Sequence, residues 1–480
     1  MSKALLTDFY QLTMMQGYFD ENIHKKQVVF DMFYRENPGG SGFAIMAGLE
    51  QLMEYIDNLR FDETDIEFLK SQGCFTNKFL EYLQDFKFTG SIDAIKEGEV
   101  VLAGEPLITV KAPIVEAQFL ETALLNIINH QCLIATKAAR ICYAAGDNLV
   151  LEFGLRRAQG PDAAIYGARA AVIGGCFATS NVEAGQRFGL PLKGTHAHSW
   201  IMSFNNELEA FRAYAKSFSS SCILLVDTYD TLKFGVPNAI KVFDELKAGG
   251  YKLENYGIRL DSGDFAYLSK QARRMLDEQG HKNAKITASC DLDEYLIESL
   301  KLQGAVIDTW GVGTSLITSK DCPAFGGVYK LVAVEDKNGN FMPKIKLSDN
   351  PEKVTNPGQK KLYRFYDSKN NKIKADLVAL YDEVIEQDLP YTLFDPKNPW
   401  KNMTLHPGKY YIRELLQPIY INGERVYQSP NVLEIRGYCK SQLDTLWDEH
   451  RRLINPHHIP VDLSQKLYDI KKDMMYSERH

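Results

Sequence analysis

The middle of the chain is organised around an apolar run that ends in a glycine and two arginines. It reads Asn148-Leu149-Val150-Leu151-Glu152-Phe153-Gly154-Leu155-Arg156-Arg157. A second run, Leu190-Pro191-Leu192, is followed by Gly194-Thr195-His196-Ala197-His198-Ser199-Trp200. Both segments lie where a strand is expected to end and a helix to begin. Cations, an aromatic ring and a histidine at one edge of a sheet indicate an enzyme that binds a phosphorylated substrate and a planar ring.

Strand-like and helical segments alternate from about residue 148 to about residue 311. The apolar runs lie near 149–153, 222–226, 256–260, 285–289 and 306–311. The helical segments between them lie near 163–175, 181–188, 205–217, 237–248 and 264–279. Asp291 and Glu294 have the spacing of a capping box that opens another helix. Repeated strand–helix units predict parallel strands joined by crossover helices.

Polar or small residues follow the strands at the point where each strand ends. They are Arg156, His198, Asp227, Asp261, Ser289 and Gly313. In a (β/α) barrel these positions meet on one rim, where active sites are built. The sequence therefore predicts an α/β fold with an irregular (β/α) barrel. A doubly wound open sheet is the alternative, and the local pattern leaves it open.

The flanking parts of the chain have a different pattern. Residues 328–334 and 361–366 read as antiparallel strands with Asn-Gly and Pro-Gly turns, and residues 430–475 read as helical and charged. We therefore predict three regions: an N-terminal α+β domain, a barrel-like catalytic domain, and a C-terminal strand and helix region that packs with the N-terminal domain. Their expected bounds are 1–135, 136–325 and 326–480.

Composition excludes several classes of protein. The chain has 480 residues, of which 45% are hydrophobic, and a formal net charge of −7, which argues against a nucleic-acid binder held by phosphate contacts alone. The eight cysteines are scattered without a C-x-x-C pair, so we expect a reducing cytoplasm and no zinc site. We expect neither a signal peptide nor a membrane span, because the first ten residues are partly polar and no apolar stretch is long enough.

Three strand-end motifs carry groups suited to phosphate, ribose or metal. The backbone of Gly311-Val312-Gly313-Thr314 and its threonine hydroxyl can cradle a phosphate, or the motif is only a tight connection. In Arg259-Leu260-Asp261-Ser262-Gly263-Asp264, Asp261 is the candidate for ribose hydroxyls or Mg²⁺, whereas Ser262 and Asp264 suit a helix cap. Asp227 follows the apolar run 222–226 and is a further candidate.

A histidine, two aromatic rings and two arginines complete the candidate site. His198 can act as general base, anion ligand or nucleophile, whereas the adjacent strand position turns His196 to the opposite side. Phe153 and Tyr10 can sandwich a flat heterocycle, although such rings are more often core. Arg156 and Arg157 each need an anion or an acid, and Glu152 or Asp162 can be that acid.

With these residues in view, the chain resembles the nicotinate phosphoribosyltransferase family over nearly its whole length. The resemblance lies in seven segments, which occur in the same order: TDFYQLTM (7–14), FYRENP (33–38), EFGLRRAQGPD (152–162), GG with TSNV (174–182), GTHAHS (194–199), RLDSGD (259–264) and KLSDNPEK (346–353). Several long motifs in the right order are highly specific.

The resemblance implies a fold and a reaction. The fold is an irregular barrel of the type II phosphoribosyltransferase kind, packed against a domain made from both chain ends, in a homodimer with shared sites. The reaction is nicotinate plus 5-phosphoribosyl 1-diphosphate giving nicotinate mononucleotide and diphosphate. It is coupled to ATP hydrolysis with Mg²⁺, is classed as a C–N ligase reaction, and belongs to NAD salvage.

The resemblance also implies a role for each site residue. His198 is phosphorylated by ATP, while Phe153 and the partner subunit's Tyr10 stack on the pyridine ring. Three arginines surround the anionic groups: Arg156 and Arg259 at the nicotinate carboxylate and diphosphate, and Arg35 of the partner subunit at the diphosphate. The remaining matches are Asp227 and Asp261 near ribose and metal, and Gly311, Gly313 and Thr314 at the 5′-phosphate.

Other activities have specific sequence requirements. A nicotinamide phosphoribosyltransferase is the nearest alternative, but relatives of that kind place an aspartate near Asn181, where a neutral residue would not repel a carboxylate. A quinolinate phosphoribosyltransferase is shorter and releases carbon dioxide. A barrel lyase or isomerase acting on sugar phosphates needs a Schiff-base lysine or a strand-end base, which we do not find. A silent regulator is disfavoured because His198, Arg259 and Asp261 are all present.

Overall fold

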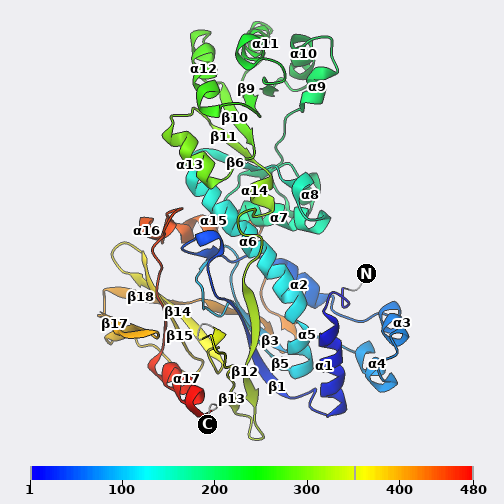
Figure 1. Cartoon of the computed structure of the whole chain (residues 1–480), viewed down its shortest axis with the longest axis vertical. Coiled ribbons are helices and arrows are strands. Elements are labelled where there is room, and N and C mark those ends of the chain that lie inside the picture. The colour runs from blue at the N-terminus through cyan, green and yellow to red at the C-terminus, as the bar shows by residue number, and fades with distance from the viewer. Residues whose placement is uncertain (1–2, 351–352, 478–480) are drawn as a thin grey trace. The chain divides into compact units, whose positions relative to one another are not determined.

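The structure is a computed structural model that describes residues 3–350 and 353–477. The chain divides into two compact units (Figure 1). Unit 1 comprises residues 1–133, 324–430 and 437–480, and unit 2 comprises residues 134–323 and 431–436. Both chain ends thus belong to unit 1. In the described part of the chain, no helix has both the length and the apolar character needed to cross a bilayer.

Unit 2 is built on a sheet of six parallel strands in the order β7-β6-β11-β10-β9-β8. The strands are β6 (Leu149–Glu152), β7 (Ala178–Thr179), β8 (Ser221–Leu225), β9 (Asn255–Leu260), β10 (Lys285–Cys290) and β11 (Thr309–Val312). A parallel bridge from Thr179 to Leu192 extends the sheet beyond β7. The sheet curls into an incomplete barrel, because no ladder among the described residues joins β8 to the Leu192 side. The predicted irregular α/β barrel is confirmed.

Short and long helices connect these strands. They are η2 (Leu155–Arg157), α7 (Pro161–Ile173), α8 (Val182–Phe188), α9 (His198–Met202), α10 (Glu207–Ser217), η3 (Thr231–Gly235), α11 (Val236–Ala248), α12 (Phe265–Glu278), α13 (Glu294–Leu302) and α14 (Thr314–Ile317). The strands read as apolar runs because helices cover the sheet, and Leu224, Ile258 and Ile286 are fully buried.

Two helix caps of unit 2 were expected from the sequence. Asp264 caps α12 by accepting from the backbone N–H of Tyr267, as predicted. The cap expected at Asp291 is wrong, because Asp293 is the N-cap residue of α13 and accepts from Leu296. Glu294 instead lies fully buried and forms ion pairs with Lys137 and Arg140 at 2.7 and 2.9 Å.

Unit 1 combines segments from both ends of the chain. The elements before residue 146 are α1 (Phe9–Asp20), β1 (Gln27–Tyr34), η1 (Pro38–Gly40), β2 (Ala44–Ile45), α2 (Leu49–Asp57), α3 (Glu63–Ser71), α4 (Asn77–Gln84), β3 (Ser91–Ile95), β4 (Val100–Val101), β5 (Ile108–Pro113), α5 (Ile114–Phe119) and α6 (Glu121–Ala145), whose C-terminal half belongs to unit 2.

The later elements begin at residue 327. They are β12 (Gly327–Glu335), β13 (Phe341–Pro343), β14 (Lys360–Asp367), β15 (Ile373–Leu380), β16 (Tyr391–Asp395), β17 (Asn398–Leu405), β18 (Tyr410–Glu414), β19 (Leu416–Ile421), β20 (Glu424–Arg425), α15 (Val432–Leu443), α16 (Asp448–Arg451), β21 (Val461–Leu463) and α17 (Gln465–Ser477). The expectation of a helical region over 430–475 is therefore partly wrong, because β21 joins a sheet beside β15.

One sheet of unit 1 joins the two chain ends directly. Its order is β13-β12-β1-β5-β3-β19-β20, with β1 antiparallel to β12 and β3 antiparallel to β19. A second sheet has the order β18-β14-β15-β21. The predicted antiparallel strands near 328–334 and 361–366 are thus confirmed as β12 and β14. The fold class with a domain made from both chain ends is confirmed as well.

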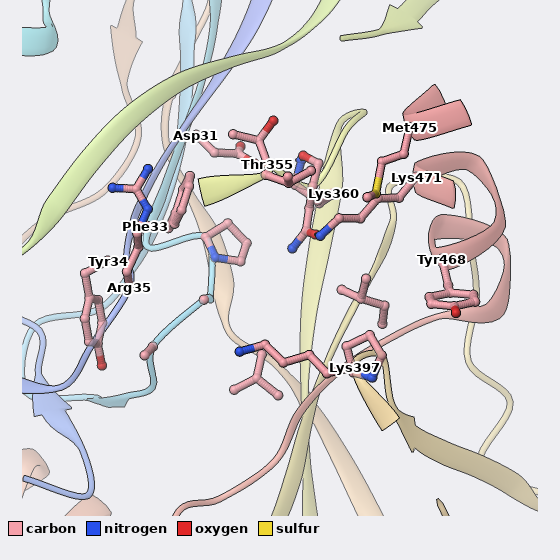
Figure 2. Close-up of a pocket in the computed structure, with 18 of the residues that line it drawn as sticks. Asp31, Phe33, Tyr34, Arg35, Thr355, Lys360, Lys397, Tyr468, Lys471 and Met475 are labelled. Carbon is pink, nitrogen blue, oxygen red and sulfur yellow. Dashed lines mark hydrogen bonds and ion pairs between the residues drawn. The ribbon is translucent and has the colours of Figure 1, made fainter. Parts of the chain in front are cut away.

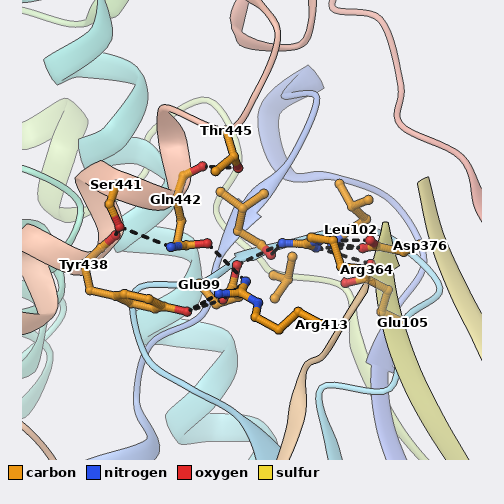
Figure 3. Close-up of polar contacts among 12 residues, drawn as sticks. Glu99, Leu102, Glu105, Arg364, Asp376, Arg413, Tyr438, Ser441, Gln442 and Thr445 are labelled. Atoms are coloured by element: carbon orange, nitrogen blue, oxygen red, sulfur yellow. Dashed lines mark hydrogen bonds and ion pairs between the residues drawn. The ribbon is translucent and has the colours of Figure 1, made fainter. Parts of the chain in front are cut away.

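A buried ionic cluster holds β14 and β15 against the segment before β5 (Figure 3). Arg364 is 0% exposed and contacts Asp376 at 2.6 Å, Glu99 at 2.9 Å and Glu105 at 3.6 Å. Arg413 adds a second cation, 2.6 Å from Glu99. Burial, followed by the neighbouring charge of Asp376, raises the pKa of Glu105 well above its ordinary value. A neutral Glu105 leaves two carboxylates facing two guanidinium groups.

Candidate active site

Five strands of unit 2 deliver side chains to the same edge of the sheet. Phe153 follows β6, Asp227 follows β8, Asp261 follows β9, Ser289 lies near the end of β10, and Gly313 follows β11. Because all the strands are parallel, their carboxyl ends lie on one side of the sheet. This edge is where the sequence predicted a site.

Arg259 and Asp261 form the centre of a hydrogen-bonded network. The Nη2 atom of Arg259 lies 2.6 Å from Asp261 Oδ1, and its Nε donates to the Ser289 hydroxyl at 2.7 Å. Ser289 in turn donates to Asp261 Oδ1. The Nη1 atom of Arg259 donates to the Thr195 hydroxyl at 3.0 Å and to the His196 carbonyl at 3.3 Å. Arg259 is thus engaged by protein groups on every nitrogen, and it fixes the orientation of Asp261.

His198 faces this network from the start of α9. Its Nε2 atom lies 3.7 Å from Asp261 Oδ2, and its Nδ1 atom lies 3.1 Å from the Thr228 hydroxyl. The His198 and Asp261 side chains are 39% and 28% exposed, so a substrate can reach both. If Nδ1 carries the proton and donates it to Thr228, the lone pair of Nε2 points toward the acidic side of the site.

The electrostatics of the site favour an ionised aspartate and one neutral histidine. Burial opposes ionisation of Asp261, but the hydrogen bond from Ser289 and the charge of Arg259 outweigh it and lower its pKa. Burial, with the charges of Arg259 and His198, lowers the pKa of His196 to about 4. His196 is buried, and its Nε2 atom accepts from the Leu225 N–H at 3.3 Å. The expectation that His196 turns away from the site is confirmed.

The two carboxylate oxygens of Asp227 differ in their hydrogen bonding. Its Oδ2 atom accepts from the Asp261 N–H at 2.8 Å and from the Ser262 hydroxyl at 2.7 Å. Its Oδ1 atom is buried and has no hydrogen-bond partner among the described residues. A buried carboxylate oxygen without a donor calls for a partner, and a cation or a ligand hydroxyl can be that partner.

Phe153 lies against Gly311 in the neighbouring strand. A Cβ atom on Gly311 would come within 2.8 Å of the Phe153 ring and within 3.2 Å of Ser289, so only glycine leaves the ring in this position. Gly311 lies inside β11, whereas Gly313 and Thr314 lie at the β11–α14 junction, where the 5′-phosphate was predicted. Gly311 thus lies between Phe153 and Ser289, and Ser289, Asp261 and His198 form a continuous series of contacts within one unit.

The loop after Phe153 is held in place by a buried glutamate and carries two arginines that are exposed to solvent. Glu152 is fully buried; it accepts from the Gly154 N–H and from the Thr179 hydroxyl, so it is not the partner of either arginine. Arg156 and Arg157 lie in η2 and are exposed to solvent. Neither guanidinium group forms a hydrogen bond or an ion pair with the described residues of this unit. Arg156 is therefore available to an anion.

Asn181, the neutral residue expected near the substrate carboxylate, has a structural role. It is 1% exposed and is the N-cap residue of α8. Its side-chain oxygen accepts from the Ala184 N–H at 3.1 Å, and its side-chain nitrogen donates to the Ala164 carbonyl at 3.2 Å. The amide oxygen and one N–H of the amide nitrogen are thus engaged by the backbone in a buried position.

The remaining predicted residues belong to unit 1. Tyr10 lies on α1 and is 48% exposed. Arg35 follows β1, and its buried Nε atom has no hydrogen-bond partner among the described residues. The KLSDNPEK motif also lies in unit 1, and its Pro351 and Glu352 lie outside the described residues. Sequence reasoning missed Thr195 and Thr228, two hydroxyl groups next to the recognised Asp227 and His196.

A metal ion would need ligands beyond those of the protein. Among the described residues there is no group of three or more His, Cys, Asp or Glu side chains placed to hold a metal. Asp227 Oδ1 and Asp261 Oδ2 offer two carboxylate oxygens on adjacent strands. This set fits Mg²⁺, which commonly binds one or two carboxylates together with substrate phosphates and water.

Comparison with known proteins identifies the family. Three protein-family models match the chain: the nicotinate phosphoribosyltransferase N-terminal domain over residues 5–129, the family itself over residues 149–376, and the C-terminal domain over residues 359–471. The chain is 47% identical to the nicotinate phosphoribosyltransferase of Bacillus subtilis (strain 168), covering 99% of this chain and 96% of that protein. It is 36% identical to the enzyme of the same name from Dictyostelium discoideum, covering 97% and 87%.

Solved structures give the same result for the fold. Human nicotinic acid phosphoribosyltransferase superposes with a TM-score of 0.86 at 29% identity, covering 98% of this chain and 99% of that one. Nicotinate-nucleotide pyrophosphorylase from Pyrococcus furiosus is similar in fold, with a TM-score of 0.70 at 24% identity, covering 92% and 95%. The incomplete barrel and its strand-edge site are those of an enzyme of the phosphoribosyltransferase class. Within that class, the chain belongs to the nicotinate phosphoribosyltransferase family.

Proposed function

We propose that the protein transfers the phosphoribosyl group of 5-phosphoribosyl 1-diphosphate to nicotinate and couples this transfer to ATP hydrolysis through a phosphorylated His198. The observation that carries the proposal is the pairing of His198 with Asp261 at the open edge of the sheet, 3.7 Å apart. The products are nicotinate mononucleotide, diphosphate, ADP and phosphate. The enzyme so defined serves NAD biosynthesis, and its free cysteines suit the cytoplasm.

Different groups of residues bind the two parts of the substrate, the pyridine ring and the ribose. The exposed Arg156 attracts the nicotinate carboxylate, while the face of Phe153 supports the pyridine ring. Holding the ring nitrogen against the C1′ carbon replaces a chance encounter with a positioned one. The neutral His196 and the paired Arg259 leave Asp261 and Asp227 as the acidic groups beside the ribose.

His198 is positioned to accept a phosphoryl group. When Nδ1 carries the proton and donates it to Thr228, the Nε2 lone pair is free to attack the terminal phosphorus of ATP. The new N–P bond forms as the bond from that phosphorus to the bridging oxygen breaks, and ADP leaves with the bond's electrons. Water later cleaves the N–P bond and releases phosphate. A phosphoryl group on His198 adds negative charge and acceptor oxygens, which can reorganise cation binding at the site.

Mg²⁺ supplies neutralisation of the diphosphate charge that develops when the C1′–oxygen bond breaks. Asp227 Oδ1 and Asp261 Oδ2 are the protein oxygens that would hold it. Asp261 is suited to this role because its lowered pKa favours the ionised form, and Asp227 is suited because its buried Oδ1 finds no hydrogen-bond partner within residues 3–350 and 353–477.

The His198→Ala variant tests the coupling. The measurement is release of ADP and diphosphate from purified protein, with and without nicotinate. The variant is expected to release no ADP above background and to form nicotinate mononucleotide at a rate that ATP does not stimulate. His406→Ala removes an exposed histidine of unit 1 and is the control, with both rates unchanged. Stimulation by ATP that survives in His198→Ala would refute the phosphohistidine.

We further propose a homodimer in which the partner subunit's Tyr10 and the partner subunit's Arg35 complete each site. Mixing Tyr10→Ala chains with His198→Ala chains, neither of which is expected to show ATP-stimulated turnover, tests this. In a two-fold dimer, half of the randomly mixed dimers are heterodimers, and each heterodimer carries one intact site, so about a quarter of wild-type activity is expected to return. Activity that stays at the level of the separate variants would contradict shared sites.

A further inference from the structure

A cavity in unit 1 and a buried histidine in unit 2 have so far been given no role of their own. The cavity has a volume of about 1050 Å³, with Arg35 and Lys360 on its wall (Figure 2). Because Arg35 already has a predicted role at the diphosphate, this cavity is not independent of the shared site. The histidine is His196, whose side chain accepts a hydrogen bond from the edge strand β8.

β8 is the last strand of the incomplete barrel, and one of its sides has no neighbouring strand among the described residues. Just past β8, the Val226 N–H donates to the Arg259 carbonyl of β9 at 3.1 Å. Because successive N–H groups of a strand point to opposite sides, the Leu225 N–H points to the open edge. Leu225 is buried, and a buried N–H without a partner is costly. His196 Nε2 accepts from this N–H at 3.3 Å and takes the place of a neighbouring strand.

The ring of His196 is held in one place by aromatic neighbours. It packs against Tyr214 with ring centroids 4.6 Å apart at 62°, and against Phe211 with centroids 6.3 Å apart, both on α10. Nε2 can accept a hydrogen bond only when the ring is neutral with its proton on Nδ1. Burial is the main cause that lowers the pKa of His196 to about 4, so the neutral ring predominates at pH 7.

The backbone beside His196 is fixed from a second strand. The Nη1 atom of Arg259 on β9 donates to the His196 carbonyl at 3.3 Å and to the Thr195 hydroxyl at 3.0 Å. Two residues after His196, the chain reaches His198 at the start of α9. The loop is therefore tied to β8 and to β9 directly before the residue that is proposed to carry the phosphoryl group.

The same two segments are joined a second time at the site itself. Thr228 follows Leu225 by three residues, and its hydroxyl lies 3.1 Å from His198 Nδ1. The contact between His196 and Leu225 thus lies just before the contact between His198 and Thr228 on both segments. A displacement of a reacting group by about 1 Å can cost about 10²-fold in rate, so the first contact controls the second.

We propose that His196 is a positioning residue for the phosphorylation of His198. By accepting from the Leu225 N–H, it holds the loop at the distance at which Thr228 fixes the His198 ring. This role rests on the proposed function, because His198 is the residue that is proposed to be phosphorylated. It gives a function to a buried side chain that touches neither substrate in that scheme.

Phosphoenzyme formation from ATP, measured by rapid quench on the intact protein, tests the role. His196→Phe keeps an aromatic ring but removes the acceptor, and we expect it to slow the reaction about tenfold. His196→Gln offers an amide at the same distance along the side chain, and its rate should stay within about threefold of the wild type. His281→Phe removes another fully buried histidine, next to Tyr256 at the start of β9, and is the control with an unchanged rate.

A double-variant cycle separates positioning from general packing. Thr228→Val is expected to slow phosphoenzyme formation about tenfold, and the double variant with His196→Phe by about tenfold rather than about a hundredfold, because both act on one contact. A normal rate in His196→Phe, an equally slow His196→Gln, or a hundredfold loss in the double variant would overturn the proposal. His196→Asn, whose amide is too short to reach the Leu225 N–H, replaces His196→Phe should that variant not fold.

The ring nitrogens of His198 test the positioning without phosphorylation. In protein labelled with ¹⁵N-histidine and free of ATP, the chemical shifts should place the His198 proton on Nδ1 in the wild type and in His196→Gln. His196→Phe should show a mixture of the two neutral tautomers. The same tautomer in all three proteins would contradict the role of His196. A wild-type protein that forms no phosphoenzyme would refute the proposed function instead, and the tautomers would still decide the role of His196.

Discussion

Unit 1 and unit 2 each contain an arginine paired with a carboxylate inside a polar cluster, and the two clusters differ in how accessible they are to a ligand. Around Arg364 in unit 1, Asp376, Glu99 and Glu105 are almost wholly buried (Figure 3). Around Arg259 in unit 2, Asp261 keeps one oxygen directed at a half-exposed histidine. The acidic groups of the first cluster are shielded from ligands by the protein, whereas Asp261 of the second cluster is accessible to a ligand.

This difference separates a structural ion pair from a functional one. Arginine next to a carboxylate occurs in both clusters, so the residue types alone do not distinguish them. Two other features distinguish them: Asp227 Oδ1 has no hydrogen-bond partner in the part of the chain that the structure describes, and the His198 side chain is 39% exposed. Variants in the two clusters should therefore affect different quantities, stability in unit 1 and turnover in unit 2.

Removing the buried cation should have the largest effect on stability. Arg364→Met leaves Asp376 buried without its counter-charge, whereas Glu99 keeps Arg413, and breaking a buried pair in this way typically costs about 3–5 kcal/mol. The free energy of unfolding, from chemical denaturation, measures the loss. The control Arg425→Met removes an exposed pair with Asp57 and should cost less than about 1 kcal/mol. Equal losses in the two variants would erase the distinction between closed and open clusters.

Neutralising Asp261 should have the largest effect on turnover. Asp261→Asn removes the charge beside His198, and we expect kcat to fall by roughly 10²–10³-fold, as when one preorganised electrostatic contact of a reacting group is lost. Denaturation should change little, because the site is partly open. Asp264→Asn is a matched control on the same loop, since asparagine caps α12 as well as aspartate does. A variant Asp261→Asn with normal kcat would place the catalytic charge elsewhere.

Glu105 makes the closed cluster sensitive to pH. Its raised pKa means that the folded chain binds more protons than the unfolded chain once the pH exceeds the ordinary glutamate value of 4.5. Its stabilising contribution is complete below that pH and is lost as the pH rises through the folded pKa. Glu105→Gln stays neutral, so its melting temperature should fall by a few degrees less than that of the wild type between pH 5 and pH 8. An identical pH dependence in both proteins would show that Glu105 is ionised when folded.

Much of unit 2 can be predicted from the sequence because its information is local. An apolar run, a polar residue at its end and a helix suffice to place Phe153, Asp227 and Asp261 on one edge. Unit 1 is less predictable, because its main sheet depends on pairing of β1 with β12 and of β3 with β19, segments separated by hundreds of residues. Nothing local specifies such a register.

Within the site, single roles are harder to predict than the position of the site. Thr228 and Thr195 were not recognised, because their importance arises only when separate strands place them beside His198 and Arg259. The role of Arg259 at the substrate stays a prediction, and the neighbours to which each of its nitrogen atoms donates are brought together only by the folded sheet. Asparagine at a strand–helix junction suits a ligand contact and a helix cap equally, so the sequence does not decide the role of Asn181.

The Asn181→Ala variant separates those two roles and should have the smallest effect. Loss of the cap of α8 is expected to lower the free energy of unfolding by about 1 kcal/mol, within the usual range of about 0.5–2 kcal/mol for such a cap. The ratio of kcat/KM for nicotinate to that for nicotinamide should not change, because the side chain is buried and both polar groups bond to backbone. Asn206→Ala removes the more exposed cap of α10, which accepts from Glu209, and should be destabilising to a similar or smaller degree. A shift of the ratio toward nicotinamide in Asn181→Ala alone would mean that Asn181 contacts the substrate after all, and that buried polar residues at this edge take part in choosing between acid and amide.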